Sequence, residues 1–193
     1  MKMMIASDIH GSAFYARKML EAFEREKADR LLLLGDLLYH GPRNDLPCEY
    51  NPKEVIMLLN SYKDKIFAVR GNCDTEVDQM VLEFPILAEY CICEVGSRNP
   101  SIRNRIMYVA HGHNFNPSKL PPMHKGDILL NGHTHIPACI DYGEYLYLNP
   151  GSVSIPKENS LNSYMMLEEG IFTWKSLEGI IFDTCQLDVN IAI

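Results

Sequence analysis

Three short apolar segments in the first third of the chain each end in a polar residue, and this pattern restricts the possible folds most. The segments span residues 2–6, 31–34 and 66–69, and helix-forming stretches separate them. Continuous apolar strands between helices are typical of a parallel sheet that is covered on both faces. Such sheets bind ligands beyond the carboxyl ends of their strands. The polar residues that follow the three strands are Asp8, Asp36 and Asn72. We therefore expect these side chains to converge at one edge of the sheet.

The remaining segments predict a two-sheet architecture. Ser12 is the expected N-cap of a helix over residues 12–27, and Pro52 marks the start of a second helix. In the second half, strands are expected at residues 86–95, 103–110, 128–130, 138–142, 145–148, 164–167, 171–177 and 180–187, with turns at 96–100 and 143–144. The prediction is a single α/β domain over residues 1–193, built as a two-sheet α/β sandwich with helices on the outer faces.

Composition and charge favour a folded protein with a small partner. Apolar residues make up 47% and charged residues 22%, which excludes extensive disorder. The net charge of −7 argues against a stable nucleic-acid partner, because binding the phosphate backbone needs excess Lys and Arg. No apolar run approaches the roughly 20 residues of a membrane span, and residues 1–10 lack the features of a signal peptide. The six cysteines contain no CxxC pair, so we expect free thiols and a cytoplasmic location.

Five short blocks of Asp, Asn and His beside glycine carry the chemistry. They are Asp8-Ile9-His10, Gly35-Asp36, Gly71-Asn72-Cys73-Asp74, His111-Gly112-His113 and Gly132-His133-Thr134-His135. Each block alone has a plainer explanation, such as a strand-end turn or a helix cap. Together they combine carboxylate, imidazole and amide groups, a set that suits Mn, Zn, Fe or Co. Their spread over five loops argues against a structural zinc site, which normally uses compact Cys and His pairs.

The order of these blocks resembles the signature of the calcineurin-like metallophosphoesterase superfamily, which is D-x-H, GD, GN-x-[DE], H and GH-x-H. Within the superfamily, the chain is most similar to the small YfcE-type phosphodiesterase family of bacteria and archaea. The loop His40-Gly41-Pro42-Arg43-Asn44 and the segment Asn149-Pro150-Gly151-Ser152 also resemble that family. The resemblance extends over residues 4–156.

The resemblance implies a metal-dependent phosphodiesterase with two divalent ions. One ion would be bound by Asp8, His10 and His135, and the other by Asn72, His111 and His133, with Asp36 bridging both. A hydroxide bridging the two ions would attack the phosphorus of a small phosphodiester. Mn is the expected metal, with Zn, Fe, Co, Ni or Mg as alternatives. The implied catalytic residues are Asp36, Asn72, His111, Cys73 and Asp74.

Cys73 is the one departure from the superfamily pattern. Many members carry His at this position, where it acts with the following acid, here Asp74, to protonate the leaving group. A thiol is a poor substitute for an imidazolium at neutral pH, so we expect slow turnover of poor leaving groups or another proton donor. A small buried side chain is the plainer role for Cys73. The candidate substrate-binding residues are Arg43, His113 and His40; a solvated loop charge is the alternative for Arg43, and a packing role is the alternative for His113.

A second class of function shares the expected fold. The retromer small subunit resembles it and serves as a protein-interaction scaffold with a degraded metal site. This chain keeps all seven ligand positions, which favours the enzyme. Among enzymes, Cys73 counts against a protein phosphatase or a dinucleoside polyphosphate hydrolase, and an acidic single domain counts against a nuclease. The resemblance is also compatible with a homodimer or homotetramer.

Overall fold

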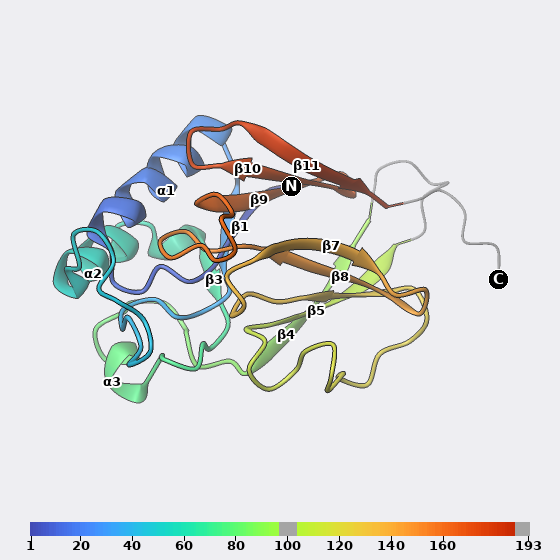
Figure 1. Cartoon of the computed structure of the whole chain (residues 1–193), viewed down its shortest axis with the longest axis horizontal. Coiled ribbons are helices and arrows are strands. Elements are labelled where there is room, and N and C mark those ends of the chain that lie inside the picture. Colours follow the sequence, from blue (N-terminus) through green and yellow to red (C-terminus); the bar gives the residue numbers. More distant parts are fainter. Residues whose placement is uncertain (97–103, 188–193) are drawn as a thin grey trace.

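Two β-sheets pack face to face, and the helices gather on one side of the pair (Figure 1). The structure is a computed structural model that describes residues 1–96 and 104–187. The six-stranded sheet has the order β11-β10-β9-β1-β2-β3, and the five-stranded sheet has the order β4-β5-β6-β8-β7. This arrangement confirms the predicted two-sheet α/β sandwich.

The bounds of the elements agree closely with the apolar segments of the sequence. The strands of the first sheet are β1 (Lys2–Ala6), β2 (Arg30–Leu33), β3 (Ile66–Ala68), β9 (Ser163–Glu168), β10 (Ile171–Ser176) and β11 (Ile181–Gln186). Those of the second are β4 (Tyr90–Val95), β5 (Arg105–Ala110), β6 (Asp127–Leu130), β7 (Pro137–Asp141) and β8 (Tyr145–Pro150). The helices are α1 (Ala13–Glu26), α2 (Pro52–Asn60), α3 (Glu76–Gln79) and the 3-10 helix η1 (Lys63–Lys65).

Parallel pairing brings the strand ends of each sheet to a common edge. In the first sheet β1 pairs in parallel with β2, and β2 with β3, whereas β9 runs antiparallel to β1. In the second sheet β6 pairs in parallel with β5 and with β8. The loops that follow β1, β2 and β3 therefore leave the first sheet at one edge, as predicted, and the loops after β5 and β6 leave the second sheet together.

The two long helices start where the sequence predicts. The Ser12 side chain accepts a hydrogen bond from the Tyr15 amide and caps α1, an interaction that typically contributes about 1 kcal/mol. Asn51 caps α2 in the same way, with Pro52 at the start of the helix. Helix α1 buries Met19 and Phe23 in a core that it shares with the first sheet.

A separate apolar core lies between the two sheets and fixes their relative position. It combines residues of the first sheet, such as Ile5 and Trp174, with residues of the second, such as Val109 and Leu148. The Trp174 indole is fully buried, and its Nε1–H donates to the Asn149 carbonyl at 2.7 Å. This hydrogen bond joins β10 of one sheet to β8 of the other, which keeps the loop edges of both sheets in register.

The structure corrects one strand boundary. The strand expected to begin at residue 86 starts at Tyr90, because the preceding backbone bonds elsewhere. The Ile86 amide donates to the Gln79 side chain at 2.8 Å, and the Ala88 carbonyl accepts from the Arg70 amide at 2.8 Å. Most of the turn expected at residues 96–100 lies outside the described residues. The short helix α3, which begins with a Thr75–Asp78 capping box, was not predicted.

The six cysteines are free thiols, as expected. Cys48 is exposed and the other five are half-buried. Cys91 and Cys93 both pack against the core between the sheets, so they share one face of β4. In the part of the chain that the structure describes, no helix has the length and apolar character needed to cross a membrane.

Candidate metal centre

All seven predicted ligands meet where the loop edges of the two sheets face each other. Asp8 and His10 follow β1, Asp36 follows β2 and Asn72 follows β3, while His111 follows β5 and the two remaining histidines follow β6. Among the described residues, three sets of possible ligand atoms lie within 4.8 Å of one another; one of them joins His10, Asp36 and Cys73, and the other two define the groups used below. The first group is Asp8, His10 and His135, and the second is Asp36, His111 and His133.

The first group is buried and its rings are held in one orientation. Asp8, His10 and His135 are at most 3% exposed. The Nδ1 atoms of His10 and His135 lie 2.8 Å from the Tyr39 carbonyl and 2.6 Å from the Ile155 carbonyl. A carbonyl only accepts, so each Nδ1 carries the proton and each Nε2 presents a lone pair. Both Nε2 atoms face Asp8 Oδ1, at 3.5 Å for His10 and 3.2 Å for His135.

The second group is more open. His111 is fully buried, and its Nδ1 lies 2.7 Å from the Leu34 carbonyl, which again leaves Nε2 as the lone-pair atom. That Nε2 lies 3.1 Å from Asn72 Oδ1 and 3.1 Å from His133 Nδ1. Asn72 is exposed and His133 is half-buried. Three atoms that can donate electron pairs to a cation therefore meet at a position that substrate can reach.

Asp36, a member of the second group, also faces the first group. Its Oδ2 atom is 3.6 Å from His10 Nε2 of the first group and 3.4 Å from His111 Nε2 of the second. Its Oδ1 atom accepts from the Cys73 amide at 2.8 Å, which fixes the carboxylate. One carboxylate oxygen is thus shared by both groups of ligand atoms, the arrangement that a bridging ligand requires.

The charges of the centre suit divalent cations. Burial alone would raise the pKa of Asp8, but His10 and His135 hold it well below its usual value. Burial alone would lower the pKa of His111, but Asp36 and Asp8 raise it to about 9, so Nε2 carries a proton at neutral pH until a cation replaces that proton. The Asp8 Oδ1 atom is buried and has no hydrogen-bond partner among the described residues. A buried carboxylate oxygen without a hydrogen-bond donor costs free energy unless a cation balances its charge. Carboxylates and imidazoles are also common ligands of divalent metals, so the residues present fit a metal centre.

The loops that carry the ligands have an unusual backbone. Five ligand residues have positive φ angles, and these are Asp8, His10, Asp36, His133 and His135, with values between 49° and 65°. Gly71 allows the loop after β3 to approach Asp36 closely, because a Cβ atom there would lie 2.2 Å from the Asp36 amide. Positive φ in non-glycine residues costs conformational energy and is concentrated at functional sites.

Asp74 ties two ligand loops together. Its Oδ2 atom accepts from the Gly71 amide at 2.7 Å and from the Asp36 amide at 2.9 Å, and its Oδ1 atom accepts from the Leu37 amide at 2.9 Å. Burial and the neighbouring Asp36 raise the pKa of Asp74, although these backbone hydrogen bonds oppose the rise. These contacts position Asp36, and the part in proton transfer that the sequence suggests for Asp74 stays a prediction.

Cys73 lines the cavity beside the second group of ligands. Its sulfur accepts a hydrogen bond from Asn72 Nδ2 at 3.2 Å. Burial and the nearby Asp36 carboxylate raise the pKa of the Cys73 thiol. The thiol is therefore protonated at neutral pH, and it has no tendency to act as a nucleophile.

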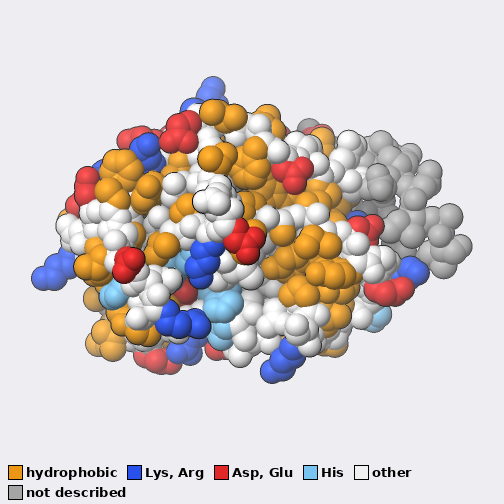
Figure 2. All heavy atoms as spheres, viewed as in Figure 1, with side chains coloured by type: hydrophobic (Ala, Val, Ile, Leu, Met, Phe, Trp, Pro, Cys, Tyr) orange, Lys and Arg blue, Asp and Glu red, His pale blue; other side chains and the backbone are white. Residues whose placement is uncertain are grey.

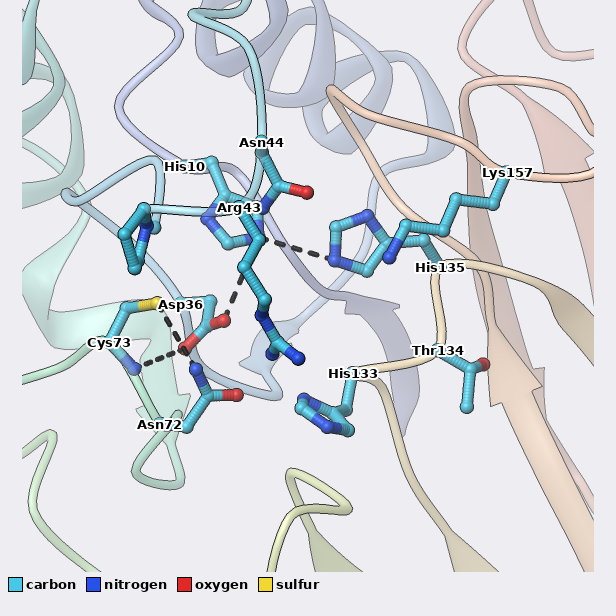
Figure 3. Close-up of a pocket in the computed structure, with 12 residues that line it drawn as sticks. His10, Asp36, Arg43, Asn44, Asn72, Cys73, His133, Thr134, His135 and Lys157 are labelled. Carbon is cyan, nitrogen blue, oxygen red and sulfur yellow. Dashed lines mark hydrogen bonds and ion pairs between the residues drawn. The ribbon is translucent and has the colours of Figure 1, made fainter.

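A cavity of about 420 Å³ opens over the ligands (Figure 3). It is lined by His10, Asp36, Gly41, Pro42, Arg43, Asn44, Asn72, Cys73, His133, Thr134, His135 and Lys157. Arg43 was expected here. Asn44, Thr134 and Lys157 were missed, and for Lys157 the only sequence signal was its nearness to the Asn149–Ser152 segment that resembles the YfcE type. Figure 2 shows histidine side chains beside Lys or Arg side chains on the same face of the molecule.

Two other expected substrate-binding residues do not line this cavity. The His113 ring lies beside His111, with ring centroids 5.5 Å apart, and its Nε2 atom is 3.1 Å from the Asn114 side-chain nitrogen. The His40 ring packs edge-on between Tyr39 and Tyr50. The Nδ1 atoms of both rings are buried without a hydrogen-bond partner among the described residues, and substrate binding by His113 or His40 stays a prediction.

Comparison with known proteins agrees with the geometry. Residues 1–170 match the model of the calcineurin-like phosphoesterase superfamily domain. Phosphodiesterase YfcE of Escherichia coli strain K12 is 45% identical over 173 residues, which cover 90% of each chain. A solved structure of YfcE, described as a phosphoesterase from E. coli, aligns with a TM-score of 0.88 at 43% identity and covers 97% of this chain and 100% of that one.

More distant structures show the fold alone. An archaeal phosphodiesterase aligns with a TM-score of 0.58 at 20% identity, covering 94% of this chain and 100% of that one. Wild-type Vps29 from Entamoeba histolytica, solved in complex with zinc, aligns with a TM-score of 0.60 at 21% identity. The alignment covers 98% of this chain and 100% of Vps29.

Proposed function

This chain belongs to the calcineurin-like phosphoesterase superfamily, and from that membership we propose that it is a metal-dependent phosphodiesterase that uses two divalent ions. The observation that carries the proposal is the shared oxygen of Asp36, which lies 3.6 Å from a ligand atom of one group and 3.4 Å from a ligand atom of the other. The expected substrate is a small phosphodiester, as the name of the E. coli relative suggests.

The residues divide into two sets of metal ligands. Asp8, His10 and His135 would hold one ion, Asn72, His111 and His133 would hold the other, and Asp36 would contribute to both. When bound, such a pair of ions supplies Lewis acidity, which activates water and neutralises charge on the phosphoryl oxygens. Mn is the metal that we propose, because a mixed carboxylate, imidazole and amide set suits a borderline divalent ion.

Other residues position the ligands and the substrate. Asp74 accepts from the Asp36 backbone amide and the Cys73 amide donates to the Asp36 carboxylate, so both position Asp36. Three backbone carbonyls fix the rings of His10, His111 and His135. Arg43 extends into the cavity (Figure 3), where its guanidinium can bind non-bridging phosphoryl oxygens. Preorganised groups of this kind lower the barrier because they need not reorient during the reaction.

The proton for the leaving group comes from a donor other than Cys73. A thiol with a raised pKa is a weaker acid than an imidazolium, so it is a poor general acid near neutral pH. We therefore expect best turnover with leaving groups that depart as stable anions, such as aryl oxides.

The domain assignment and the location are also proposals. A single domain is supported by the core between the sheets, which mixes residues of both sheets throughout. A cytoplasmic location is supported by six free thiols, which a reducing compartment maintains.

The test combines metal analysis with a substrate panel on protein reconstituted with Mn. We expect close to two ions per chain and faster hydrolysis of bis(4-nitrophenyl) phosphate than of 4-nitrophenyl phosphate. The alternative, a protein-interaction scaffold with the same fold, predicts bound metal without hydrolysis of either ester under any divalent ion. That outcome would overturn the proposed activity.

A further inference from the structure

A second cationic side chain extends into the cavity from a different loop. Arg43 comes from the loop between β2 and α2, whereas Lys157 comes from the loop between β8 and β9 (Figure 3). Among the residues that the structure describes, neither side chain has an ion-pair partner. Two unpaired cations at the mouth of one cavity point to an anionic ligand.

The backbone of Lys157 is fastened to a metal-ligand residue. The Lys157 amide donates to the His135 carbonyl at 3.2 Å, and two residues earlier the Ile155 carbonyl holds the His135 ring at 2.6 Å. The Lys157 carbonyl accepts from the amide and the hydroxyl of Ser160, at 3.0 and 2.6 Å. The same short loop therefore orients a ligand of the first group and fixes the position from which Lys157 extends.

A strained turn maintains this arrangement. Glu158 and Asn159 have φ angles of 54° and 58°, and the hydrogen bond from the Ser160 amide to the Lys157 carbonyl closes the turn around them. Two consecutive residues with positive φ form a type I′ turn, which is costly when neither residue is glycine. A turn maintained at this cost indicates that the direction of Lys157 matters.

Charge balance separates the roles of the two cations. Two divalent ions, which the proposed function assumes, carry four positive charges. Four negative charges balance them, one each from Asp8, Asp36, a hydroxide nucleophile and a singly charged phosphodiester, so the centre is neutral. Arg43 adds one positive charge, which suits the charge that develops on the phosphoryl oxygens during the reaction. Lys157 adds a further positive charge. A simple diester has no negative charge left to balance it, because the charge of its scissile phosphate is already counted.

We propose that Lys157 is a specificity-determining residue that binds a second anionic group, of phosphate or phosphonate type, carried by the phosphodiester substrate. The natural substrate class is then a diester with an additional phosphate, rather than a simple dialkyl or diaryl diester. This inference rests on the proposed function for the identity of the scissile group and goes beyond it in the class of substrate.

The test measures binding without turnover. The probes are diphenyl phosphate and the same diester with a phosphonate group on one ring, whose phenolate leaving groups are poor, and each dissociation constant is measured by calorimetry on Mn-loaded protein over a time in which neither probe is hydrolysed. We expect the wild-type chain to prefer the phosphonate-bearing diester. We expect Lys157→Gln to weaken that ligand about tenfold, the usual loss for one charge-assisted hydrogen bond, and to change diphenyl phosphate less than about twofold. Lys157→Arg should restore most of the preference, and Lys53→Gln, an exposed lysine on α2, should leave both constants unchanged.

Three results would overturn the inference. The first is a wild-type chain that binds both probes equally. The second is an equal loss of affinity for both probes in Lys157→Gln, which would assign Lys157 to the scissile phosphate alone. The third is a Lys157→Gln variant with both dissociation constants unchanged. A parallel assay on Mn-loaded wild-type protein, with 4-nitrophenyl esters of matched charge, separates this inference from the proposed function. Failure to hydrolyse either ester contradicts the activity, whereas equal turnover of both contradicts only the substrate class.

Discussion

Two clusters of charged side chains, one around the half-buried Glu26 and one around the buried Asp8 and Asp36, are balanced in opposite ways. Glu26, at the end of α1, receives two hydrogen bonds from Lys175 Nζ at 2.7 and 2.9 Å and one from the Tyr164 hydroxyl at 2.8 Å. Asp8 and Asp36, at the loop edge, face histidines, and among the described residues no Lys or Arg forms an ion pair with either of them. The chain supplies its own counter-charges to the first cluster, and for the second it depends on cations from solution.

The comparison shows which carboxylates stabilise the fold without metal and which do so only when metal is bound. A cluster completed by a lysine contributes to folding under any solution conditions near neutral pH. A cluster that lacks a permanent positive charge contributes only when metal is bound, and its free energy of folding then depends on metal concentration. The predictions below test this difference, from the largest expected effect to the smallest.

Asp36→Asn should have the largest effect. The substitution keeps the shape of the side chain but removes the charge shared by both groups of ligands, so we expect kcat/KM to fall on the order of a thousandfold. Metal analysis should detect substantial loss of bound Mn in the same protein. Near-normal turnover with two bound ions would contradict the bridging role of Asp36.

Removal of metal should destabilise the wild-type protein strongly. Ions present at about a thousand times their dissociation constant stabilise the fold by about 4 kcal/mol, so a chelator should lower Tm on the order of 10 °C. Differential scanning calorimetry with and without chelator measures this shift. Glu26→Gln should show the same chelator-induced shift, because its cluster is complete without metal. An unchanged Tm in the wild-type protein would mean that the loop edge is stable without ions.

Cys73→His should change the dependence on leaving group without changing metal content. An imidazole at this position can donate a proton, so we expect hydrolysis of an alkyl aryl diester with a poor leaving group to accelerate by about tenfold. Hydrolysis of bis(4-nitrophenyl) phosphate should change little, and Cys73→Ser is the matched control for side-chain size. Equal rates in both variants across the panel would exclude position 73 from proton transfer.

Glu26→Gln should have a small effect that depends on pH. Burial alone would raise the pKa of Glu26, but Lys175 and Tyr164 lower it below its ordinary value near 4.5. The contribution of a carboxyl group with a lowered pKa is fully present above the ordinary pKa and is lost as the pH falls through the folded pKa.

We therefore expect Glu26→Gln to lower the free energy of unfolding by about 1 kcal/mol at pH 7, with the difference shrinking in acid. Urea unfolding at several pH values measures this difference. Glu168→Gln, which removes an exposed ion pair to Lys2 at 3.8 Å, should change stability by less than about 0.5 kcal/mol at every pH. A difference for Glu26→Gln that persists unchanged in acid would assign its effect to packing.

The convergence of the seven candidate ligands could be predicted from the sequence because its signal is local. Each candidate follows an apolar strand and has a glycine within three residues, so the strand pattern and the turn chemistry together indicate its place. Ser12 as a helix cap and the parallel strands before Asp8 and Asp36 follow from the same local rules.

Contacts between distant segments are what the sequence does not reveal. Lys157 reaches the cavity only because its amide bonds to the His135 carbonyl, and no local pattern at residue 157 indicates that contact. Likewise, the late start of β4 depends on the Gln79 side chain, which binds the Ile86 amide across a loop. Asp74 follows a motif that suggests proton transfer, and only the folded chain reveals the three backbone amides that it binds.

The positive φ angles of five ligand residues have a consequence for how such a chain changes over generations. A residue other than glycine with positive φ costs on the order of 1 kcal/mol, so replacing Asp8, His10, Asp36, His133 or His135 by glycine would relieve local strain. If catalysis were no longer under selection, mutation would therefore erode these positions first while the fold gained stability. Folding stability and metal binding thus make opposite demands on these five positions, so a glycine at any of them should stabilise the metal-free fold while it weakens metal binding.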